Sequence, residues 1–158
     1  SSSLCIPLED EINQLKLYLE LEKIRFNDGF DYSFSVDKEL ESGVFEIPAM
    51  VLQPFVENAL IHGILNLDGK RGVLDISIEK SDDRLYASIK DNGVGRESAI
   101  EIKKQKEKRY KSIAIPNIQQ RLEIMQKNKL GTINIDIEDL VEDNKSSGTL
   151  VKVDMPLS

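Results

Sequence analysis

Apolar and polar positions alternate along this chain with two different periods. Between residues 8 and 26, apolar side chains recur every three or four positions, as at Leu8, Ile12 and Leu15. This spacing, with acidic residues in the first turn, predicts an amphipathic helix. A period of two, which is typical of strands with one buried face, occurs in five segments: Phe30 to Val36, Val73 to Glu79, Arg84 to Lys90, Thr132 to Ile137 and Thr149 to Met155.

The segment from Ile47 to Gly63 reads IPAMVLQPFVENALIHG and predicts one buried helix, because apolar residues lie all round it. A second amphipathic helix is predicted over Ile113 to Lys127. A short strand over Val44 to Ile47, a hairpin turn at Ser81 to Asp83 and a polar loop over Glu142 to Gly148 complete the pattern. These elements indicate an α+β two-layer sandwich, in which one helix precedes a mixed, mostly antiparallel sheet with helices on one face.

Composition excludes several classes of protein. The chain has 158 residues, of which 40% are hydrophobic and 31% charged, as expected for one globular domain, alone or with an appendage. No apolar run approaches the roughly 20 residues of a membrane-spanning helix. The net charge of -7 argues against non-specific nucleic-acid binding. Cys5 is the only cysteine and His62 the only histidine, which excludes an internal disulfide and a zinc site built on several such ligands.

Two groups of polar residues stand out in these apolar elements. Glu57 and Asn58 lie within the apolar helix, where a carboxylate and an amide are costly unless they have partners. Asp91 ends a predicted strand and is followed by Gly93 and Gly95, which let the backbone approach a flat ligand because glycine has no Cβ. On its own this second group is also compatible with an ordinary turn. Together, the two groups predict one shared ligand site, in which Asp91 accepts a hydrogen bond from an exocyclic amine.

Four motifs follow one another in order: Leu52 to Ala59 with His62 and Gly63, Asp91 to Gly95, Asn117 to Leu122, and Gly148 to Val151 with Pro156. In this order they resemble the ATP-binding domain of histidine kinases, which has the Bergerat-type fold shared with gyrase, heat-shock chaperones and mismatch-repair ATPases. The chain looks most like the LytS-type sensor kinases, whose central box has the form LQPxVENAxxHG. The resemblance implies an ATP-binding catalytic domain over residues 28–158, preceded over residues 1–27 by the end of a helical dimerisation and phosphoacceptor domain.

The resemblance implies an adenine site around the end of the predicted hairpin. Asp91 would accept a hydrogen bond from the adenine amino group, helped by a bound water and by the Thr149 hydroxyl. Gly93 and Gly95 would let the base and a lid approach the backbone.

The resemblance also implies a phosphate site on the central helix. Asn58 would ligate Mg²⁺ within a shell completed by phosphate oxygens and water, as this ion prefers. Glu57 would be the catalytic base that orients or deprotonates the attacking group. His62 would lie near the phosphates or the helix end, and the alternative for His62 is a packing role.

The segment from Arg96 to Lys111 would form the lid over the nucleotide, and its seven basic residues against three acidic ones could meet a triphosphate. The alternative for most of these basic residues individually is a solvated surface. Within it, Arg109 and Lys111 are the residues expected to bind nucleotide. Ser112 is assigned to the same site and could also cap the following helix. The chain departs from the family pattern at two places. Ser112-Ile113-Ala114 stands where the family usually has Gly-x-Gly, and on the central helix Ile61 stands where a basic residue is common.

The resemblance implies a two-component sensor histidine kinase that transfers the γ-phosphoryl group of ATP to a histidine outside this chain. A response regulator would receive the phosphoryl group, and the protein would form a homodimer through its preceding helical domain. Membrane segments elsewhere in a longer protein would place the domain at the cytoplasmic face of the cell membrane. Two alternatives stay open: a degenerate nucleotide-binding or scaffolding module, favoured by Ser112 and Ala114, and an ATPase or protein-serine kinase of the same superfamily.

Overall fold

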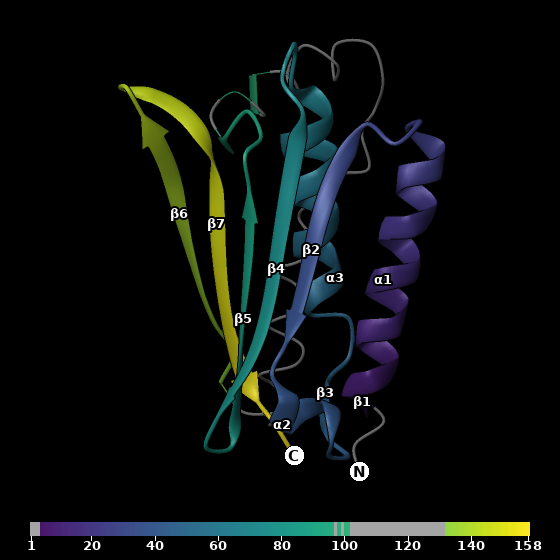
Figure 1. The fold of residues 1–158 in the computed structure, drawn as a ribbon. Coiled ribbons are helices and arrows are strands. Elements are labelled where there is room, and N and C mark those ends of the chain that lie inside the picture. Colours follow the sequence, from purple (N-terminus) through teal and green to yellow (C-terminus); the bar gives the residue numbers. More distant parts are fainter. Residues whose placement is uncertain (1–3, 97, 99, 102–131) are drawn as a thin grey trace.

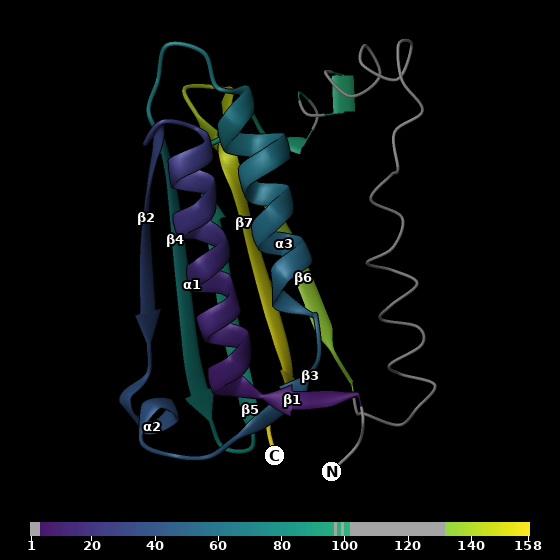
Figure 2. The same cartoon turned by 90° about the vertical axis from the view of Figure 1, so that its right-hand side faces the viewer.

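The computed structural model describes residues 4–96, 98, 100–101 and 132–158, which form a sheet with helices on one face (Figures 1 and 2). The sheet contains, in spatial order, β2 (Phe30–Val36), β4 (Gly72–Ser81), β5 (Arg84–Asp91), β7 (Lys145–Pro156) and β6 (Asn134–Glu142). Two helical segments lie side by side over it: α1 (Leu8–Arg25), and α3 (Leu52–Asn58) with its continuations η1 (Ala59–Gly63) and η2 (Ile64–Asn66). The predicted α+β two-layer sandwich is confirmed.

Strand pairing is antiparallel throughout the sheet except between β2 and β4. The β4–β5 hairpin turns between Ser81 and Arg84, as predicted. Because β2 and β4 run parallel, the chain between them must cross over one face of the sheet. That crossover contains α2 (Lys38–Glu41), β3 (Glu46–Pro48) and α3, so the sheet's topology fixes which face the central helix covers.

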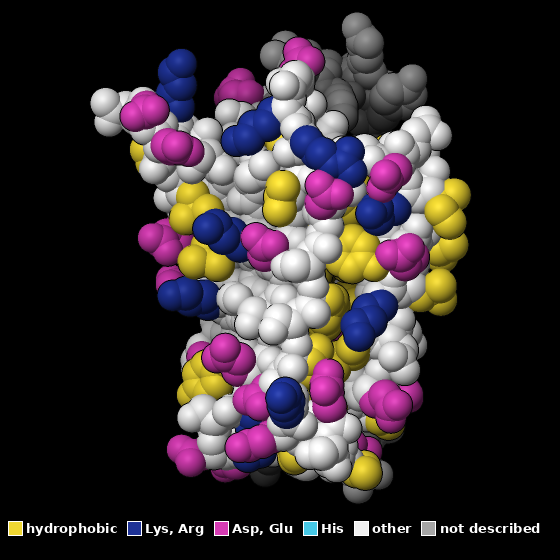
Figure 3. Space-filling view, in the orientation of Figure 1, with side chains coloured by type: hydrophobic (Ala, Val, Ile, Leu, Met, Phe, Trp, Pro, Cys, Tyr) yellow, Lys and Arg dark blue, Asp and Glu magenta, His cyan; other side chains and the backbone are white. Residues whose placement is uncertain are grey.

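The hydrophobic core lies between the sheet and the two helices. Alternate residues of the central strands point into it, as the period of two predicts. The core consists mainly of Leu74, Ile76 and Ile78 on β4, Leu85, Ala87 and Ile89 on β5, Val151, Val153 and Met155 on β7, and Leu15, Leu19, Leu52, Val56 and Leu60 on the helices. The opposite face of the sheet is exposed, and the described basic and acidic side chains on it are interspersed (Figure 3).

The prediction of one helix from Ile47 to Gly63 is wrong at its start. Ile47 and Pro48 belong to β3, where Ile47 pairs with Ile6 of β1 (Cys5–Pro7). A residue before proline is pushed away from helical dihedrals, and proline cannot donate a backbone hydrogen bond. The chain then turns at Met50, which has a φ of 64°, and the helix begins at Leu52. The predicted short strand before the helix is therefore shifted toward the C-terminus.

The predicted loop from Glu142 to Gly148 is also wrong. Glu142 pairs with Lys145, so β6 and β7 form a hairpin with a two-residue turn. Asp143 and Asn144 have φ angles of 52° and 61°. Positive φ at both central residues is the requirement of the tight turn that matches the twist of a hairpin, and Asp and Asn tolerate it. The polar residues that suggested a loop thus form a turn and the start of a strand.

Helix α1 shares the core of the sheet with α3. Leu15 and Leu19 are fully buried, while Leu17, Leu21 and Ile24 are exposed on its outer side. The predicted helix over residues 8–26 is confirmed, and the predicted domain boundary at residue 27 stays a prediction. No helix among the described residues is both long and apolar enough to cross a membrane. The predicted helix over Ile113 to Lys127 lies outside the described residues.

Candidate functional site

Asp91 is a buried acid at the end of β5 and forms the centre of the candidate site. Only 4% of its surface is exposed, and its Oδ1 accepts a hydrogen bond from the backbone N–H of Gly93 at 2.8 Å. Burial raises the pKa of Asp91 to about 6, although the backbone N–H groups of Gly93 and Thr149 oppose the rise. Asp91 is therefore a fixed carboxyl group whose pKa lies well above the ordinary value for aspartate.

The end of the central helix contacts the segment that follows Asp91. A Cβ added to Gly93 would lie 2.3 Å from the carbonyl carbon of Gly63, and one added to Gly63 would lie 2.9 Å from Asp91 Oδ1. Val94 N also donates to Gly63 O at 3.3 Å. The end of η1 therefore meets the residues after β5, and glycine on both sides of the contact allows this close approach. The two predicted motifs, one on the helix and one after the strand, are brought together.

The first residues of β7 complete this contact. Thr149 is buried and is the cross-strand partner of Asp91. Gly148 has a φ of 135°, and a Cβ there would lie 1.9 Å from Asp91 O, so only glycine lets the two strands approach. Gly95 has a φ of 84° and packs against Ser146, because its added Cβ would lie 1.9 Å from Ser146 Oγ. Asp91, Gly93, Gly95 and Thr149 therefore lie close together at this end of the sheet.

Asn58 is the last residue of α3 and lies five residues before Gly63, which ends the π-helical segment η1 that continues α3. Its side chain is half-buried, and no described residue hydrogen-bonds its amide. His62 is half-buried one turn further on, and its backbone carbonyl accepts a hydrogen bond from Asn66 Nδ2 at 3.0 Å. Asn58 and His62 thus follow each other along one side of the helix toward Gly63.

Glu57 faces another part of the molecule. Its Oε1 accepts a hydrogen bond from Gln53 Nε2 at 2.9 Å, one turn earlier on α3. Its charge also acts on Tyr18 of α1, whose pKa is raised first by burial and then by Glu22 and Glu57. Among the described residues, no ion pair neutralises Glu57. Glu57 therefore lies on the side of the helix that packs toward α1.

Arg96 is the first residue of the predicted lid and is paired with the sheet. Its Nε and Nη2 donate to the two carboxylate oxygens of Asp139 on β6, both at 2.7 Å. These hydrogen bonds lower the pKa of Asp139. Three other predicted site residues, Arg109, Lys111 and Ser112, lie outside the described residues.

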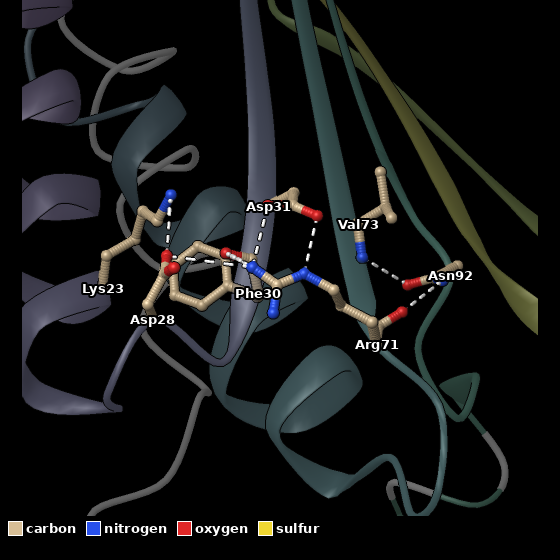
Figure 4. A network of polar contacts seen from close by, with 7 residues as sticks. All are labelled: Lys23, Asp28, Phe30, Asp31, Arg71, Val73 and Asn92. Atoms are coloured by element: carbon tan, nitrogen blue, oxygen red, sulfur yellow. Dashed lines mark hydrogen bonds and ion pairs between the residues drawn. The ribbon is translucent and has the colours of Figure 1, made fainter.

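Three residues were not assigned to the site from the sequence but contribute to its geometry. Gly63 and Gly148 provide the close backbone contacts around Asp91. Asn92 fixes the chain after β5, because its Oδ1 accepts from Val73 N at 2.7 Å and its Nδ2 donates to Arg71 O at 3.1 Å (Figure 4). The signals were a glycine at a helix end, a glycine at a strand start, and an asparagine between an aspartate and a glycine. None of these signals identifies the distant backbone segment that the residue contacts in the structure.

The sequence of the chain is similar to those of several known proteins. The chain is 38% identical over 128 residues to the sensor protein LytS of Oceanobacillus iheyensis, an alignment that covers 77% of this chain and 21% of that protein. It is 31% identical over 121 residues to the sensor histidine kinase YpdA of Escherichia coli, covering 76% and 21% respectively. The chain belongs to the LytS-like sensor histidine kinases. No protein-family model matches it.

Solved structures support the fold of this LytS-like chain. The catalytic domain of the histidine kinase ThkA superposes with a TM-score of 0.62 at 18% identity, covering 96% of this chain and 97% of that domain. The crystal structure of ThkA in complex with the response regulator protein TrrA also matches, with a TM-score of 0.55 at 16% identity and coverage of 96% and 41%. The LytS-like chain spans about a fifth of the length of the two relatives, at 21% of each.

Proposed function

We propose that the chain is the ATP-binding catalytic domain of a two-component sensor histidine kinase. The observation that carries the proposal is the position of Asp91, a buried carboxylate at the point where the end of the central helix meets the end of β5. A buried acid of this kind is costly to the fold, because burial disfavours its charged form. This cost would be offset if the Asp91 carboxylate accepted a hydrogen bond from a donor group on a ligand.

The donor that we assign to Asp91 is the exocyclic amino group of adenine. Oδ1 is already held by the Gly93 N–H, so the other carboxylate oxygen would accept from the ligand. Thr149, directly across from Asp91, would help to hold the base through its hydroxyl group. Gly93 and Gly95 would lie against the base and the lid. A site built around such a donor rejects a nucleotide without the amino group, because the buried carboxylate would be left unpaired.

The phosphate end of the nucleotide would lie along the helix near Asn58. The amide of Asn58 is half-buried and has no hydrogen-bond partner among the described residues, so it is free to act as an oxygen ligand. Mg²⁺ keeps several waters and accepts one or two protein ligands together with phosphate oxygens, which suits a single amide. Within the described part of the chain, no group of three or more His, Cys, Asp or Glu could hold a metal instead. His62, Arg109, Lys111 and Ser112 are proposed as further nucleotide contacts.

The proposed reaction is in-line transfer of the γ-phosphoryl group of ATP to an imidazole nitrogen. The bond from the γ-phosphorus to the bridging oxygen breaks as the nitrogen–phosphorus bond forms, and ADP leaves. Positioning and charge neutralisation carry most of such a reaction. A neutral imidazole has a free lone pair, so we expect Glu57 to contribute about a hundredfold or less as a base. The acceptor histidine would lie outside this chain, because its only histidine, His62, belongs to the nucleotide helix.

The proposed partners follow from the family. ThkA has been crystallised with the response regulator TrrA, and we propose that a response regulator receives the phosphoryl group here too. The longer protein would form a homodimer through a helical domain, of which residues 1–27 would be the end. Membrane segments elsewhere in that protein would hold this domain at the cytoplasmic face of the membrane.

A degenerate nucleotide-binding or scaffolding module is the second candidate. Glu57, the proposed base, is hydrogen-bonded to Gln53 and lies toward α1, and Ser112 and Ala114 replace two glycines that the family usually has. In a degenerate module, nucleotide would bind without phosphoryl transfer.

Calorimetry with Mg-ATP tests the binding half of the proposal. The wild-type chain should bind Mg-ATP, and Asp91→Asn should weaken binding by about tenfold to a hundredfold, the effect of losing a hydrogen bond to a charged group. Asn58→Ala should remove the dependence of binding on Mg²⁺. Asp75→Asn, an exposed change on the open face of the sheet, is the matched control. Millimolar or absent binding that Asp91→Asn leaves unchanged would contradict the proposal.

The transfer half is tested on the longer protein that carries the acceptor histidine. With γ-labelled ATP, label should appear on the protein as acid-labile phosphohistidine and disappear in Asn58→Ala. Binding without labelling would favour the degenerate module, and acid-stable phosphoserine or phosphate release alone would favour the superfamily's other enzymes.

A further inference from the structure

Asn92, between Asp91 and Gly93, attaches the end of β5 to the start of β4 with three hydrogen bonds. Its side-chain Oδ1 accepts from Val73 N at 2.7 Å and its Nδ2 donates to Arg71 O at 3.1 Å. Its backbone N–H also donates to Val73 O at 3.2 Å. Both ends of the amide are thus used, and both bind backbone atoms rather than mobile side chains (Figure 4).

The backbone to which Asn92 binds is itself held by the Arg71 side chain. Nε and Nη2 of Arg71 donate to the two carboxylate oxygens of Asp31 on β2, at 2.7 and 2.9 Å, and Nη2 donates to Phe30 O at 3.4 Å. These hydrogen bonds lower the pKa of Asp31. A planar, two-bonded contact of this kind fixes orientation as well as distance. Asn92 therefore binds a segment that the Arg71 side chain connects to the start of β2.

The attachment continues from Arg71 toward α1. Asp28, in the turn between α1 and β2, lies 3.8 Å from Arg71 Nη2 and 3.0 Å from Lys23 Nζ. These charges are exposed and each pair contributes little energy by itself. Their effect is geometric, because they connect the last turns of α1 and the starts of β2 and β4 to the residue beside Asp91.

Because Asn92 lies between Asp91 and Gly93, its hydrogen bonds to the start of β4 also affect the geometry around the Asp91 carboxylate. Gly93 supplies the N–H that holds Asp91 Oδ1, and Gly93 also packs on the Gly63 backbone. Both contacts require the chain to leave β5 in one direction, and the Asn92 amide sets that direction. We propose that Asn92 is a positioning residue, which holds the Asp91 carboxylate in the orientation that recognises the amino group of adenine. This inference rests on the proposed nucleotide-binding function.

A comparison of two nucleotides separates positioning from a purely structural role. Calorimetry would measure the affinities for Mg-ATP and for the magnesium complex of a purine ribonucleoside triphosphate that lacks the 6-amino group. The wild type should prefer ATP. Asn92→Ala should lower the affinity for ATP by about tenfold, as expected for the loss of one to two hydrogen bonds, and change the affinity for the analogue by less than about twofold. The preference for ATP should then be largely lost.

Two further variants keep the test decisive. Asn92→Asp keeps the acceptor for Val73 N but places a carboxylate oxygen against Arg71 O, so the preference for ATP should fall in this variant too, and it serves if Asn92→Ala does not fold. Asn134→Ala is the matched control, because Asn134 also donates through its amide, to Asp154 Oδ1 at 2.9 Å, at the opposite end of the sheet. It should leave both affinities unchanged.

A double-mutant cycle tests whether Asn92 acts through Asp91. Residues that act as a unit show non-additive effects, so adding Asn92→Ala to Asp91→Asn should cost no further affinity for ATP. The inference is overturned if Asn92→Ala weakens both nucleotides equally, leaves ATP affinity unchanged, or adds its full effect to Asp91→Asn. Failure of the wild type to bind ATP, or to prefer it, would instead overturn the proposed function and this inference with it.

Discussion

Asp91 illustrates, at the scale of one residue, a conflict between stability and recognition. Its carboxyl group is buried, and its pKa of about 6 means that the folded state binds its proton more tightly than the unfolded chain does. The favourable contribution to stability is complete below the ordinary pKa of 3.8 and is lost as the pH rises through about 6. Near neutral pH the fold therefore holds an ionised acid at a cost, which binding of an amino group would offset.

We expect Asp91→Asn to stabilise the protein at high pH only. Asn keeps an oxygen that can accept from the Gly93 N–H and has no charge to bury. Because each pKa unit corresponds to about 1.4 kcal/mol, the free energy of unfolding should rise by ~1–3 kcal/mol at pH 8. Urea unfolding at pH 8 and pH 4 measures this change. An equal effect at both pH values would mean that ionisation of Asp91 is not its cause.

We expect Gly93→Ala to disturb both the fold and the site. Its Cβ would lie 2.3 Å from the backbone of Gly63, which cannot move without shifting the end of the helix. The loss of stability should be ~1–3 kcal/mol, as for other forced insertions into packed regions, and Mg-ATP affinity should fall. Gly69→Ala is the control, because no atom lies within 4 Å of its added Cβ. Its positive φ makes it mildly destabilising, but its Mg-ATP affinity should match the wild type.

At the scale of elements, the sequence predicted the strands well and the central helix only in part. The period of two in β4 and β5 reflects a local rule, since alternate residues must face the core. The start of the helix depends on a distant partner, because Ile47 pairs with Ile6 and the chain turns at Met50. An apolar run is equally compatible with a buried strand and a buried helix. The pattern therefore could not show where one ended and the other began.

Glu11 connects the two helices and was not identified from the sequence. It is fully buried on α1, and neither carboxylate oxygen makes a hydrogen bond of good geometry with a described residue. Burial raises its pKa, while the backbone N–H groups of Gln53, Leu52 and Met50, at the start of α3, oppose the rise. Glu11 thus faces the positive end of the helix that carries the proposed phosphate site.

We expect Glu11→Gln to stabilise the protein more at pH 8 than at pH 4. The raised pKa of Glu11 means that its contribution to stability is present below its ordinary value of 4.5 and is lost as the pH rises. Removing the charge should raise the free energy of unfolding at pH 8 by up to ~2 kcal/mol, a typical cost of a poorly satisfied buried group. Glu9→Gln, an exposed change in the same helix turn, is the control. Stability that decreases in Glu11→Gln at pH 8 would instead identify the carboxylate as a net stabilising cap.

At the scale of the whole molecule, the layers were predictable and the order of strands was not. Short turns and mixed elements indicated one sheet with helices on one face. Two of the strand pairs join residues that are far apart in sequence: β2 pairs with β4 in parallel, and β5 pairs with β7. The two groups of polar residues, together with the family resemblance, predicted that the central helix and Asp91 share one site. The roles of Gly63 and Gly148 could not be predicted from the sequence, because a glycine in a sequence does not indicate which distant backbone segment it will contact.

We expect α1 to be part of the same folding unit as the sheet. Leu19 is fully buried in the common core, so Leu19→Ala should lower the free energy of unfolding of the whole domain by ~2–5 kcal/mol. Leu21→Ala is the control on the same helix, because Leu21 is 55% exposed and its loss should cost less than about 0.5 kcal/mol. Denaturant unfolding followed by circular dichroism measures both. Equal, small effects would place α1 outside this core and favour a boundary near residue 27.

Nucleotide binding at the end of β5 can be tested by titrating the isotopically labelled chain with Mg-ADP and recording ¹⁵N–¹H correlation spectra. The amide resonances of Gly63, Gly93 and Thr149 should shift together with one saturation constant, because the helix end, the end of β5 and the start of β7 would enclose one nucleotide. Amides on the open face of the sheet, such as those of Ser88 and Lys152, should stay in place. The absence of shifts at Gly63, Gly93 and Thr149, or shifts confined to the open face, would mean that nucleotide does not bind between these three segments.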